Sequence, residues 1–169
     1  SPTEGATNRS ACILCAPGKA NPIPGSSNAS KCRSCLRGSF AASAGMGHCV
    51  PCLAGTFADR SAQTACVECR HGHYCPRGSS IPSPCPMGTA LNAVGARAVD
   101  SCITVAAGYW ASLGSRTPTP CGIGTYNALL GQNHPTACRQ CPLFATTLGT
   151  AATNLSECVC MATLELTVN

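Results

Sequence analysis

The sequence predicts a small disulfide-rich fold, arranged as an elongated ladder of tandem cysteine-rich repeats with short β-ribbons, turns and little helix. Three observations lead to this prediction. The chain has 16 Cys among 169 residues, a density typical of a disulfide scaffold or a metal array. Only 27 residues are Leu, Ile, Val or Phe, so few large apolar side chains remain to build one core. The Cys residues also recur at fixed intervals, which indicates an internal repeat.

Each repeat runs from the second Cys of a C-x-x-C pair to the first Cys of the next pair. The intervals between these two Cys residues are 14 or 17 residues. Cys12 would close an earlier repeat, and Cys160 would open a later one. The six regular repeats are Cys15 to Cys32, Cys35 to Cys49, Cys52 to Cys66, Cys85 to Cys102, Cys121 to Cys138 and Cys141 to Cys158.

Two irregular repeats support this register. The repeat from 105 to 118 has Val105 at its opening position and Pro118 at its closing position, so both Cys residues are lost together. That is expected if the two ends of a repeat bond to each other, because a single orphan thiol is a liability in an oxidising compartment. The repeat from Cys69 to Pro82 lacks only its closing Cys, and Cys75 occurs inside it. We therefore expect Cys69 to pair with Cys75.

The register predicts seven disulfides and leaves two Cys residues for partners outside the segment. Cys12 and Cys160 are these two; a bond between them would require the two ends of the segment to meet. Sixteen Cys allow very many pairings, and only the register and the paired losses favour this one. The predicted bonds are Cys15–Cys32, Cys35–Cys49, Cys52–Cys66, Cys69–Cys75, Cys85–Cys102, Cys121–Cys138 and Cys141–Cys158.

Three further positions recur in the repeats. A Gly three residues after the opening position would permit a positive φ in a tight turn, and an aromatic residue two positions later is expected to cover a disulfide. Ser or Thr two positions before the closing Cys is expected to cap a turn. The last repeat has Phe144 in place of Gly and ends Cys-Val-Cys. The members are Gly18, Gly38, Gly55, Gly72, Gly88, Gly108 and Gly124; Phe40, Phe57, Tyr74, Trp110 and Tyr126; and Ser10, Ser30, Thr64, Thr136 and Ser156.

Regular secondary structure is expected to be sparse, because Pro and Gly together make up 30 residues and no helical period lies between the Cys clusters. We assign residues 1–14 to the end of a preceding repeat and 15–102 to repeats 1 to 5. Residues 103–120 form the repeat that lacks its disulfide, and 121–160 form repeats 7 and 8. Residues 161–169 would begin a following element, and within them 163–168 alternate polar and apolar side chains.

A zinc protein is the main chemical alternative, because paired C-x-x-C motifs are a strong zinc signal. Cys12 and Cys15 with Cys32 and Cys35 would form one tetrad, and Cys49 and Cys52 with Cys66 and Cys69 another. Half of the Cys residues fall outside this scheme and are spaced singly, which favours paired loops, so no cofactor or metal is expected. The four His residues are interpreted as exposed loop residues: His48, His71, His73 and His134.

Three N-glycosylation sequons point to secretion, and each Asn lies four residues before a closing Cys. The acceptors are Asn8, Asn28 and Asn154. Other functional classes are disfavoured. The 11 basic residues are scattered, which argues against a nucleic-acid surface, and the six acidic residues form no acid/base pair, so an enzyme is not expected. No run of 18 apolar residues occurs, so any membrane anchor is expected outside this segment of a longer or processed polypeptide.

The repeat C-x-x-C-x-x-G-x-[FY] resembles the ephrin-receptor-like cysteine-rich repeats, which are related in style to tumour necrosis factor receptor modules. The closest stretch is 32–90, within which residues 69–89 look like a variant common in large protist and algal ectodomains. The resemblance covers nearly the whole chain. It implies an extracellular, disulfide-laddered stalk of the kind found in receptor stems, surface coats and flagellar hair filaments called mastigonemes.

Two functions remain open on the sequence. The first is a structural spacer in a glycosylated cell-surface or filament-forming protein, for instance on the surface of a flagellum or cilium, whose partners are other subunits or copies of itself. The second is the ligand-binding stem of a surface receptor, with a candidate contact patch at Tyr109, Trp110, Leu129 and Leu130, where large apolar residues are concentrated. The same four residues could instead pack between repeats in place of the missing 105–118 disulfide.

Overall fold

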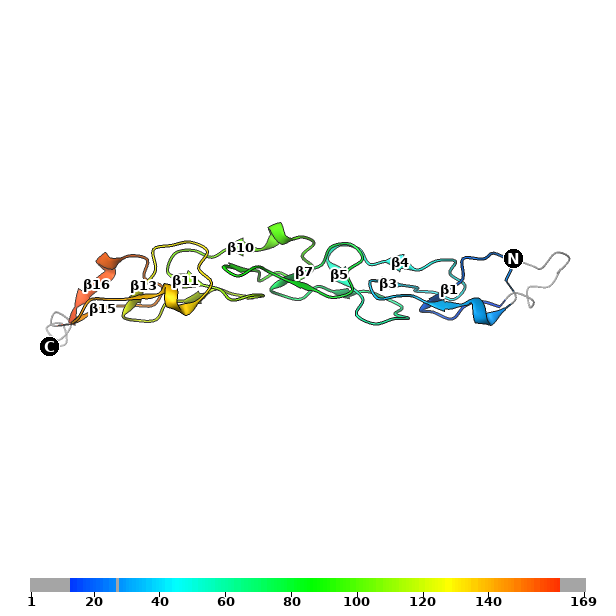
Figure 1. Ribbon diagram of the computed structural model, residues 1–169, viewed down its shortest axis with the longest axis horizontal. Helices are drawn as coiled ribbons and strands as arrows, with labels where there is room; N and C mark the ends of the chain where they lie inside the picture. Colours follow the sequence, from blue (N-terminus) through cyan, green and yellow to red (C-terminus); the bar gives the residue numbers. More distant parts are fainter. Residues whose placement is uncertain (1–12, 27, 162–169) are drawn as a thin grey trace. The chain divides into compact units, whose positions relative to one another are not determined.

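The computed structural model describes residues 13–26 and 28–161. Within them, sixteen short strands pair into eight two-stranded sheets, and four single-turn 3-10 helices lie between strands (Figure 1). The prediction of a disulfide-rich, ladder-like fold of short strands and turns is confirmed. The sheets are β1 (Lys19–Ala20) with β2 (Arg33–Ser34), β3 (Ser39–Phe40) with β4 (Val50–Pro51), β5 (Thr56–Phe57) with β6 (Val67–Glu68), β7 (His73–Tyr74) with β8 (Ser83–Pro84), β9 (Thr89–Ala90) with β10 (Ile103–Thr104), β11 (Tyr109–Trp110) with β12 (Thr119–Pro120), β13 (Thr125–Tyr126) with β14 (Arg139–Gln140), and β15 (Ala145–Thr147) with β16 (Cys158–Cys160).

The chain divides into two compact units. Unit 1 comprises residues 1–70, 74–83 and 94–98, and unit 2 comprises residues 71–73, 84–93 and 99–169. Repeats 1 to 3 belong to unit 1 and repeats 6 to 8 to unit 2. The eight repeats keep the numbers that follow from the sequence register, from repeat 1 at Cys15 to repeat 8 at Cys158.

Each sheet has the same origin in the sequence. In repeats 1 to 7 the two residues between the closing position and the next opening position form the second strand, and they pair with the fourth and fifth residues after the opening position; in repeat 8 the second strand is Cys158–Cys160 and pairs with Ala145–Thr147. In repeat 1, Lys19 pairs with Ser34 and Ala20 with Arg33, antiparallel. The tight turn that leads into the first strand has Gly18 as its third residue with φ of 83°, which a Gly adopts without strain.

The difference between 14-residue and 17-residue repeats is one helical turn. The four 3-10 helices all lie directly before the closing Cys of a 17-residue repeat, and the additional three residues supply that turn. They are η2 (Ala29–Lys31), η3 (Val99–Ser101), η4 (Pro135–Ala137) and η5 (Leu155–Glu157). The interval between the Cys residues therefore reports whether a repeat carries this helix.

Seven disulfides occur within residues 13–26 and 28–161, and they are the seven pairs that the sequence predicts. Six join the two ends of a repeat at separations of 14 or 17 residues, and Cys69–Cys75 spans 6 residues. Cys160 is exposed at the end of β16. Cys12 and residues 1–12 in general lie outside the described part of the chain.

Backbone hydrogen bonds join consecutive repeats in a fixed pattern. In unit 1, Gly18 N–H donates to the Ala41 carbonyl at 2.8 Å, and the next repeat returns a bond from Gly45 N–H to the Cys15 carbonyl at 2.8 Å. In unit 2 the same two bonds run from Gly88 to Ala111 and from Gly114 to Cys85, at 2.8 and 2.9 Å. The turn Gly thus has a second role beyond its φ, because its N–H is the donor that holds the next repeat.

Small side chains and half-cystines fill the interior. The position six residues after each opening residue is buried in repeats 2 to 8, because its carbonyl or side chain faces the turn Gly of the preceding repeat. Ala and Cys suit this position, since they allow close backbone approach, and Leu, Asn and Thr also occupy it. Its occupants are Ala41, Ala58, Cys75, Leu91, Ala111, Asn127 and Thr147.

Candidate interaction surfaces

Repeat 6 lacks a disulfide, and an apolar cluster surrounds the residue at its opening position. Val105 occupies the opening Cys position and is 3% exposed. It packs with Ala90 and Ala111 in one buried cluster, and Tyr109 lies against that cluster. An aliphatic side chain therefore takes the opening position of repeat 6 and is buried, as are most of the half-cystines at the other opening positions.

The candidate patch predicted from the sequence is divided in the structure. Tyr109 and Trp110 form β11 and are half-buried. Leu129 and Leu130 lie in a loop of repeat 7 and are 56% and 68% exposed. Tyr109 belongs with the cluster that replaces the disulfide, as the packing interpretation expects, whereas the two Leu side chains face solvent.

An apolar groove that the sequence did not reveal lies beside this cluster. It has a volume of about 410 Å³ and runs between β10 and the end of repeat 6. Ile103, 72% exposed, lies on one wall, and Arg116 lies on the other. The Arg116 guanidinium donates from Nε to the Asn92 side-chain oxygen at 2.7 Å, which fixes a cation at the rim of the groove. The groove could hold an extended apolar segment that carries a carboxylate.

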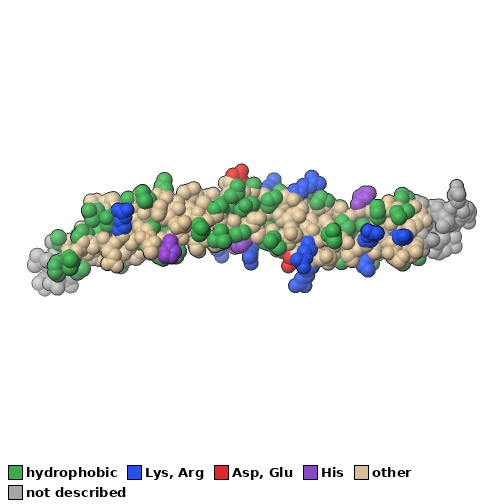
Figure 2. Space-filling view, viewed as in Figure 1, with side chains coloured by type: hydrophobic (Ala, Val, Ile, Leu, Met, Phe, Trp, Pro, Cys, Tyr) green, Lys and Arg blue, Asp and Glu red, His purple; other side chains and the backbone are tan. Residues whose placement is uncertain are grey.

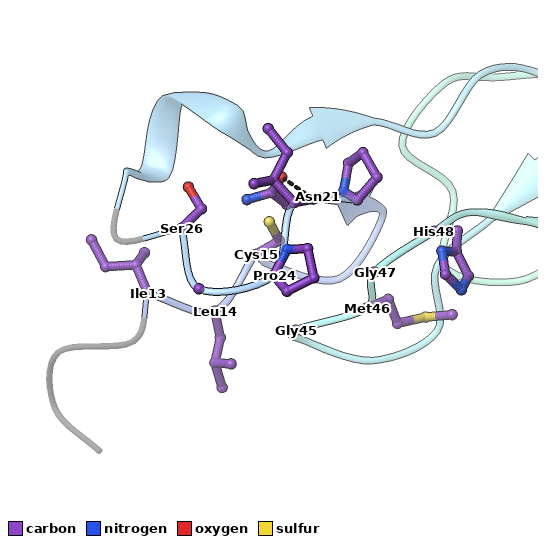
Figure 3. Close-up of a pocket in the computed structure, with 13 residues that line it drawn as sticks. Ile13, Leu14, Cys15, Asn21, Pro24, Ser26, Gly45, Met46, Gly47 and His48 are labelled. Carbon is purple, nitrogen blue, oxygen red and sulfur yellow. Dashed lines mark hydrogen bonds between the residues drawn. The ribbon is translucent and has the colours of Figure 1, made fainter. Parts of the chain in front are cut away.

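A second hollow lies in unit 1 between repeats 1 and 2 (Figure 3). Its volume is about 280 Å³, and its lining includes Asn21 and Pro24 from repeat 1 and Met46 and His48 from repeat 2. In later repeats, the residue equivalent to Asn21 receives the bond from the preceding turn Gly. The lining is therefore the edge onto which a preceding repeat would stack, and Cys12 is the predicted closing Cys of such a repeat.

Surface charge is dispersed. Figure 2 shows single basic side chains and small separate groups of hydrophobic side chains on the face that it draws. No group of three or more His, Cys, Asp or Glu side chains that could hold a metal ion occurs among residues 13–26 and 28–161. Six of the Cys residues of the two conceivable zinc tetrads lie in the disulfides Cys15–Cys32, Cys35–Cys49 and Cys52–Cys66.

Two of the sequon Asn residues cap helices. The Asn28 side-chain oxygen accepts from the Ser30 N–H at 2.9 Å at the start of η2, and Asn154 accepts from the Ser156 N–H at 3.0 Å at the start of η5. Both Asn side chains are exposed, so each is accessible for modification. Asn8 lies outside the described residues.

The expected turn cap requires a correction. The sequence assigned the cap to the Ser or Thr two positions before the closing Cys, but in η2 and η5 that residue supplies the N–H and the Asn two positions earlier supplies the acceptor. His134 takes the same role in η4, where its Nδ1 accepts from the Thr136 N–H at 3.3 Å. Each Asn stands at the N-cap position, from which its side-chain oxygen reaches the N–H group of the second following residue, whereas the Ser lies inside the helix.

His71 and His73 are half-buried rather than exposed, His73 lies in strand β7, and both side chains contact backbone oxygens. His71 Nδ1 lies 2.8 Å from the Asn92 carbonyl oxygen, and His73 Nδ1 lies 2.9 Å from the His71 carbonyl oxygen. The His71 contact therefore joins repeat 4 to repeat 5, whereas the His73 contact lies within repeat 4.

Comparison with known families agrees with the repeat register. Residues 108–158 match the family described as tyrosine-protein kinase ephrin type A/B receptor-like. The match starts at the turn Gly of repeat 6 and ends at the closing Cys of repeat 8, and the seven disulfides follow one register along the chain. The match over 108–158 and the seven disulfides of the described residues together support ephrin-receptor-like cysteine-rich repeats. A search of the curated proteins finds no match.

These repeats and the density of disulfides indicate an extracellular or cell-surface module of a non-catalytic kind. No helical segment within residues 13–26 and 28–161 has the length and apolar character that crossing a bilayer requires.

Proposed function

We propose that the chain is a structural spacer in a glycosylated extracellular protein that forms filaments or a surface coat, with a flagellar hair filament as the most specific candidate. The observation that carries the proposal is the repeated pair of backbone bonds between consecutive repeats, which is present in each unit. A chain whose repeats contact mainly their neighbours extends by addition of repeats, and its length is set by their number. The partners would be other subunits or further copies of the chain.

Deletion of one repeat in the parent protein tests the spacer. Removal of residues 35–51 deletes repeat 2 and leaves the C-x-x-C spacing intact. The expected result is normal secretion and assembly, with the distance between the flanking domains shortened, as measured by electron microscopy of the assembled protein. Unchanged spacing, or a loss of assembly that the insertion of an unrelated repeat does not restore, would contradict the proposal.

Glycosylation forms part of the proposal, and the caps allow a clean test. Ser30→Ala and Ser156→Ala abolish the sequons but keep the Asn28 and Asn154 oxygens that cap the helices. Each variant should lose the mass of one glycan in intact-mass spectra of the secreted protein, with the disulfide map unchanged. A wild-type spectrum free of glycan mass at both sites would remove glycosylation from the proposal.

A receptor stem is the second candidate, and the groove beside repeat 6 favours it. Ile103→Asp places a charge on the groove wall, and Leu113→Asp places the same charge on a Leu of repeat 6 that is 60% exposed and does not line the groove. If the stem binds a ligand, saturable binding of the labelled chain to source cells is lost with Ile103→Asp and kept with Leu113→Asp. Equal binding by both variants would leave the groove without this role.

A further inference from the structure

Contacts in the ladder extend beyond the adjacent repeat. In unit 1, a Cβ built on Gly18 would lie 2.1 Å from the carbonyl oxygen of Ala62, which belongs to the second following repeat. In unit 2, a Cβ built on Gly108 would likewise lie 2.1 Å from the Ala151 carbonyl oxygen. All six turn glycines that have a second following repeat show this approach, at 2.0–2.4 Å: Gly18, Gly38, Gly55, Gly72, Gly88 and Gly108.

The turn position is therefore restricted for two separate reasons. Its φ between 69° and 95° favours Gly, and the carbonyl of the second following repeat leaves no space for a Cβ. Gly124 of repeat 7 has only the first of these two restrictions. Its φ is 81°, but the nearest atom to a built Cβ is Thr146 Oγ1 at 3.6 Å, an ordinary contact. No second following repeat lies above Gly124 within the described residues.

Repeat 8 is the exception, because its turn position holds a large aromatic residue in place of Gly. Phe144 occupies the turn position and keeps the left-handed backbone, with φ of 63°. Its carbonyl accepts from the Met161 N–H at 2.9 Å, as the Gly124 carbonyl accepts from Cys141 N–H at 2.9 Å. Its side chain is 78% exposed, so the strained backbone of a bulky residue is not offset by burial. A residue that breaks a local rule without a packing gain suggests a role other than stability.

We propose that Phe144 terminates the ladder. Its side chain fills the space that the carbonyl of a second following repeat takes at every interior position, so at most one further repeat can stack beyond repeat 8 in this geometry. The structure places Met161 at the next opening position and not Cys160, which the sequence register assigned, because the Met161 N–H donates to the carbonyl of the preceding turn residue as Cys141 does. The next turn position in the sequence is then Leu164 rather than Gly. A repeat that follows repeat 8 would therefore be the last one in this geometry, which limits the length of the spacer at this end.

An extended chain tests the terminator directly. Residues from 161 onward are replaced by a copy of residues 35–68, which adds two repeats in register, in the Phe144 and F144G backgrounds. The probe is deuterium uptake at the amide equivalent to Ala62 in the second added repeat, because that amide bonds to the Cys35 carbonyl when the repeat is stacked. At least tenfold slower exchange in the F144G chain is expected. Equal exchange in the two chains would overturn the proposal.

A matched pair in the unextended chain keeps the proposal testable if the extended chain folds poorly. Gly108→Phe imposes both the φ strain and the clash with Ala151, whereas Gly124→Phe imposes only the φ strain. The Ala151 amide, which bonds to the Cys121 carbonyl at 2.8 Å, should exchange at least tenfold faster in G108F than in G124F. Equal rates would show that a side chain at this position does not displace the second following repeat, and would refute the terminator.

Discussion

Repeats 6 and 7 lie in the same unit, and repeat 7 has a disulfide and the helix η4, both of which repeat 6 lacks. Repeat 7 is closed by Cys121–Cys138, whereas repeat 6 has Val105 and Pro118 at these positions. Both nevertheless have the same two-stranded ribbon. Repeat 6 also keeps the ladder bonds, because Gly108 N–H donates to the Asn127 carbonyl at 2.7 Å.

This comparison separates what determines the shape of a repeat from what stabilises it. The backbone register and the small buried side chains determine the shape of a repeat, since repeat 6 attains that shape without a disulfide. The disulfide contributes mainly by restricting the unfolded chain. In repeat 6 the cluster around Val105 takes over part of that stabilisation through burial.

The largest expected effect comes from making repeat 7 resemble repeat 6. The double variant Cys121→Ala and Cys138→Ala should lower the free energy of unfolding by about 2–4 kcal/mol, the range for loss of a native disulfide. Native-state hydrogen exchange of repeat 7 measures this. The pattern of protected amides should persist, including Ala151, which bonds to the carbonyl of residue 121. Complete loss of protection across repeat 7 would mean that the disulfide itself determines the shape.

The next effect weakens repeat 6. Val105→Ala removes two buried methyl groups from the cluster with Ala90 and Ala111, and should lower the free energy of unfolding by about 2 kcal/mol. Val99→Ala is the control, because Val99 is 48% exposed and should change by less than about 0.5 kcal/mol. Urea denaturation of the two variants gives the comparison. Similar losses for both would show that the cluster does not substitute for the disulfide.

A smaller effect concerns the turn that repeats 7 and 8 have and repeat 6 lacks. Asn154→Ala removes the cap of η5 and should cost about 1 kcal/mol, whereas Ser156→Ala keeps the cap and should cost little. Both remove the sequon, so the difference reports the Asn154 side chain, which is the cap together with its Nδ2 bonds to Thr153 and Glu157. Thermal unfolding of the deglycosylated proteins measures it, and equal melting temperatures would count against a stabilising cap.

The smallest effect is a pH dependence of the same turn. The Thr153 N–H and then its hydroxyl hold the pKa of Glu157 below its ordinary value of 4.5, each donating to Oε1 at 2.8 Å. Because the folded pKa is lowered, the stabilisation is present above about pH 4.5 and is lost as the pH falls through the folded value. In wild type, the hydrogen-exchange rate of the Thr153 amide, corrected for its intrinsic pH dependence, should rise as the pH falls through the folded pKa of Glu157. In Glu157→Gln it should stay constant; a parallel rise in both would contradict the assignment.

The sequence predicted the parts of the fold that depend on spacing. The paired losses at Val105 and Pro118 placed the disulfide register, and Gly18 and its equivalents marked the turn. The sequence did not reveal that Gly108 lies against Ala151, because the two are far apart in the chain and no local pattern records the approach. Ala41 and its equivalents were also missed, since Ala is common and small size alone is a weak signal.

The candidate surfaces were harder to predict than the fold. Tyr109 stood out as an aromatic residue, but only its packing on Val105 assigns it to the interior. The groove arises because Arg116 and Asn92, far apart in sequence, come together beside β10. Phe144 was visible as an exception to the Gly pattern, and its meaning depended on knowing what lies above the turn position in earlier repeats.

One measurement tests the central claim, that this is an oxidised ladder of closed repeats outside the cell. The protein is secreted, alkylated under denaturing, non-reducing conditions and weighed intact, which counts its free thiols. Seven disulfides use 14 of the 16 Cys, so two or fewer alkylated thiols are expected. Eight or more thiols in native material would contradict the ladder and favour an intracellular, zinc-binding protein instead.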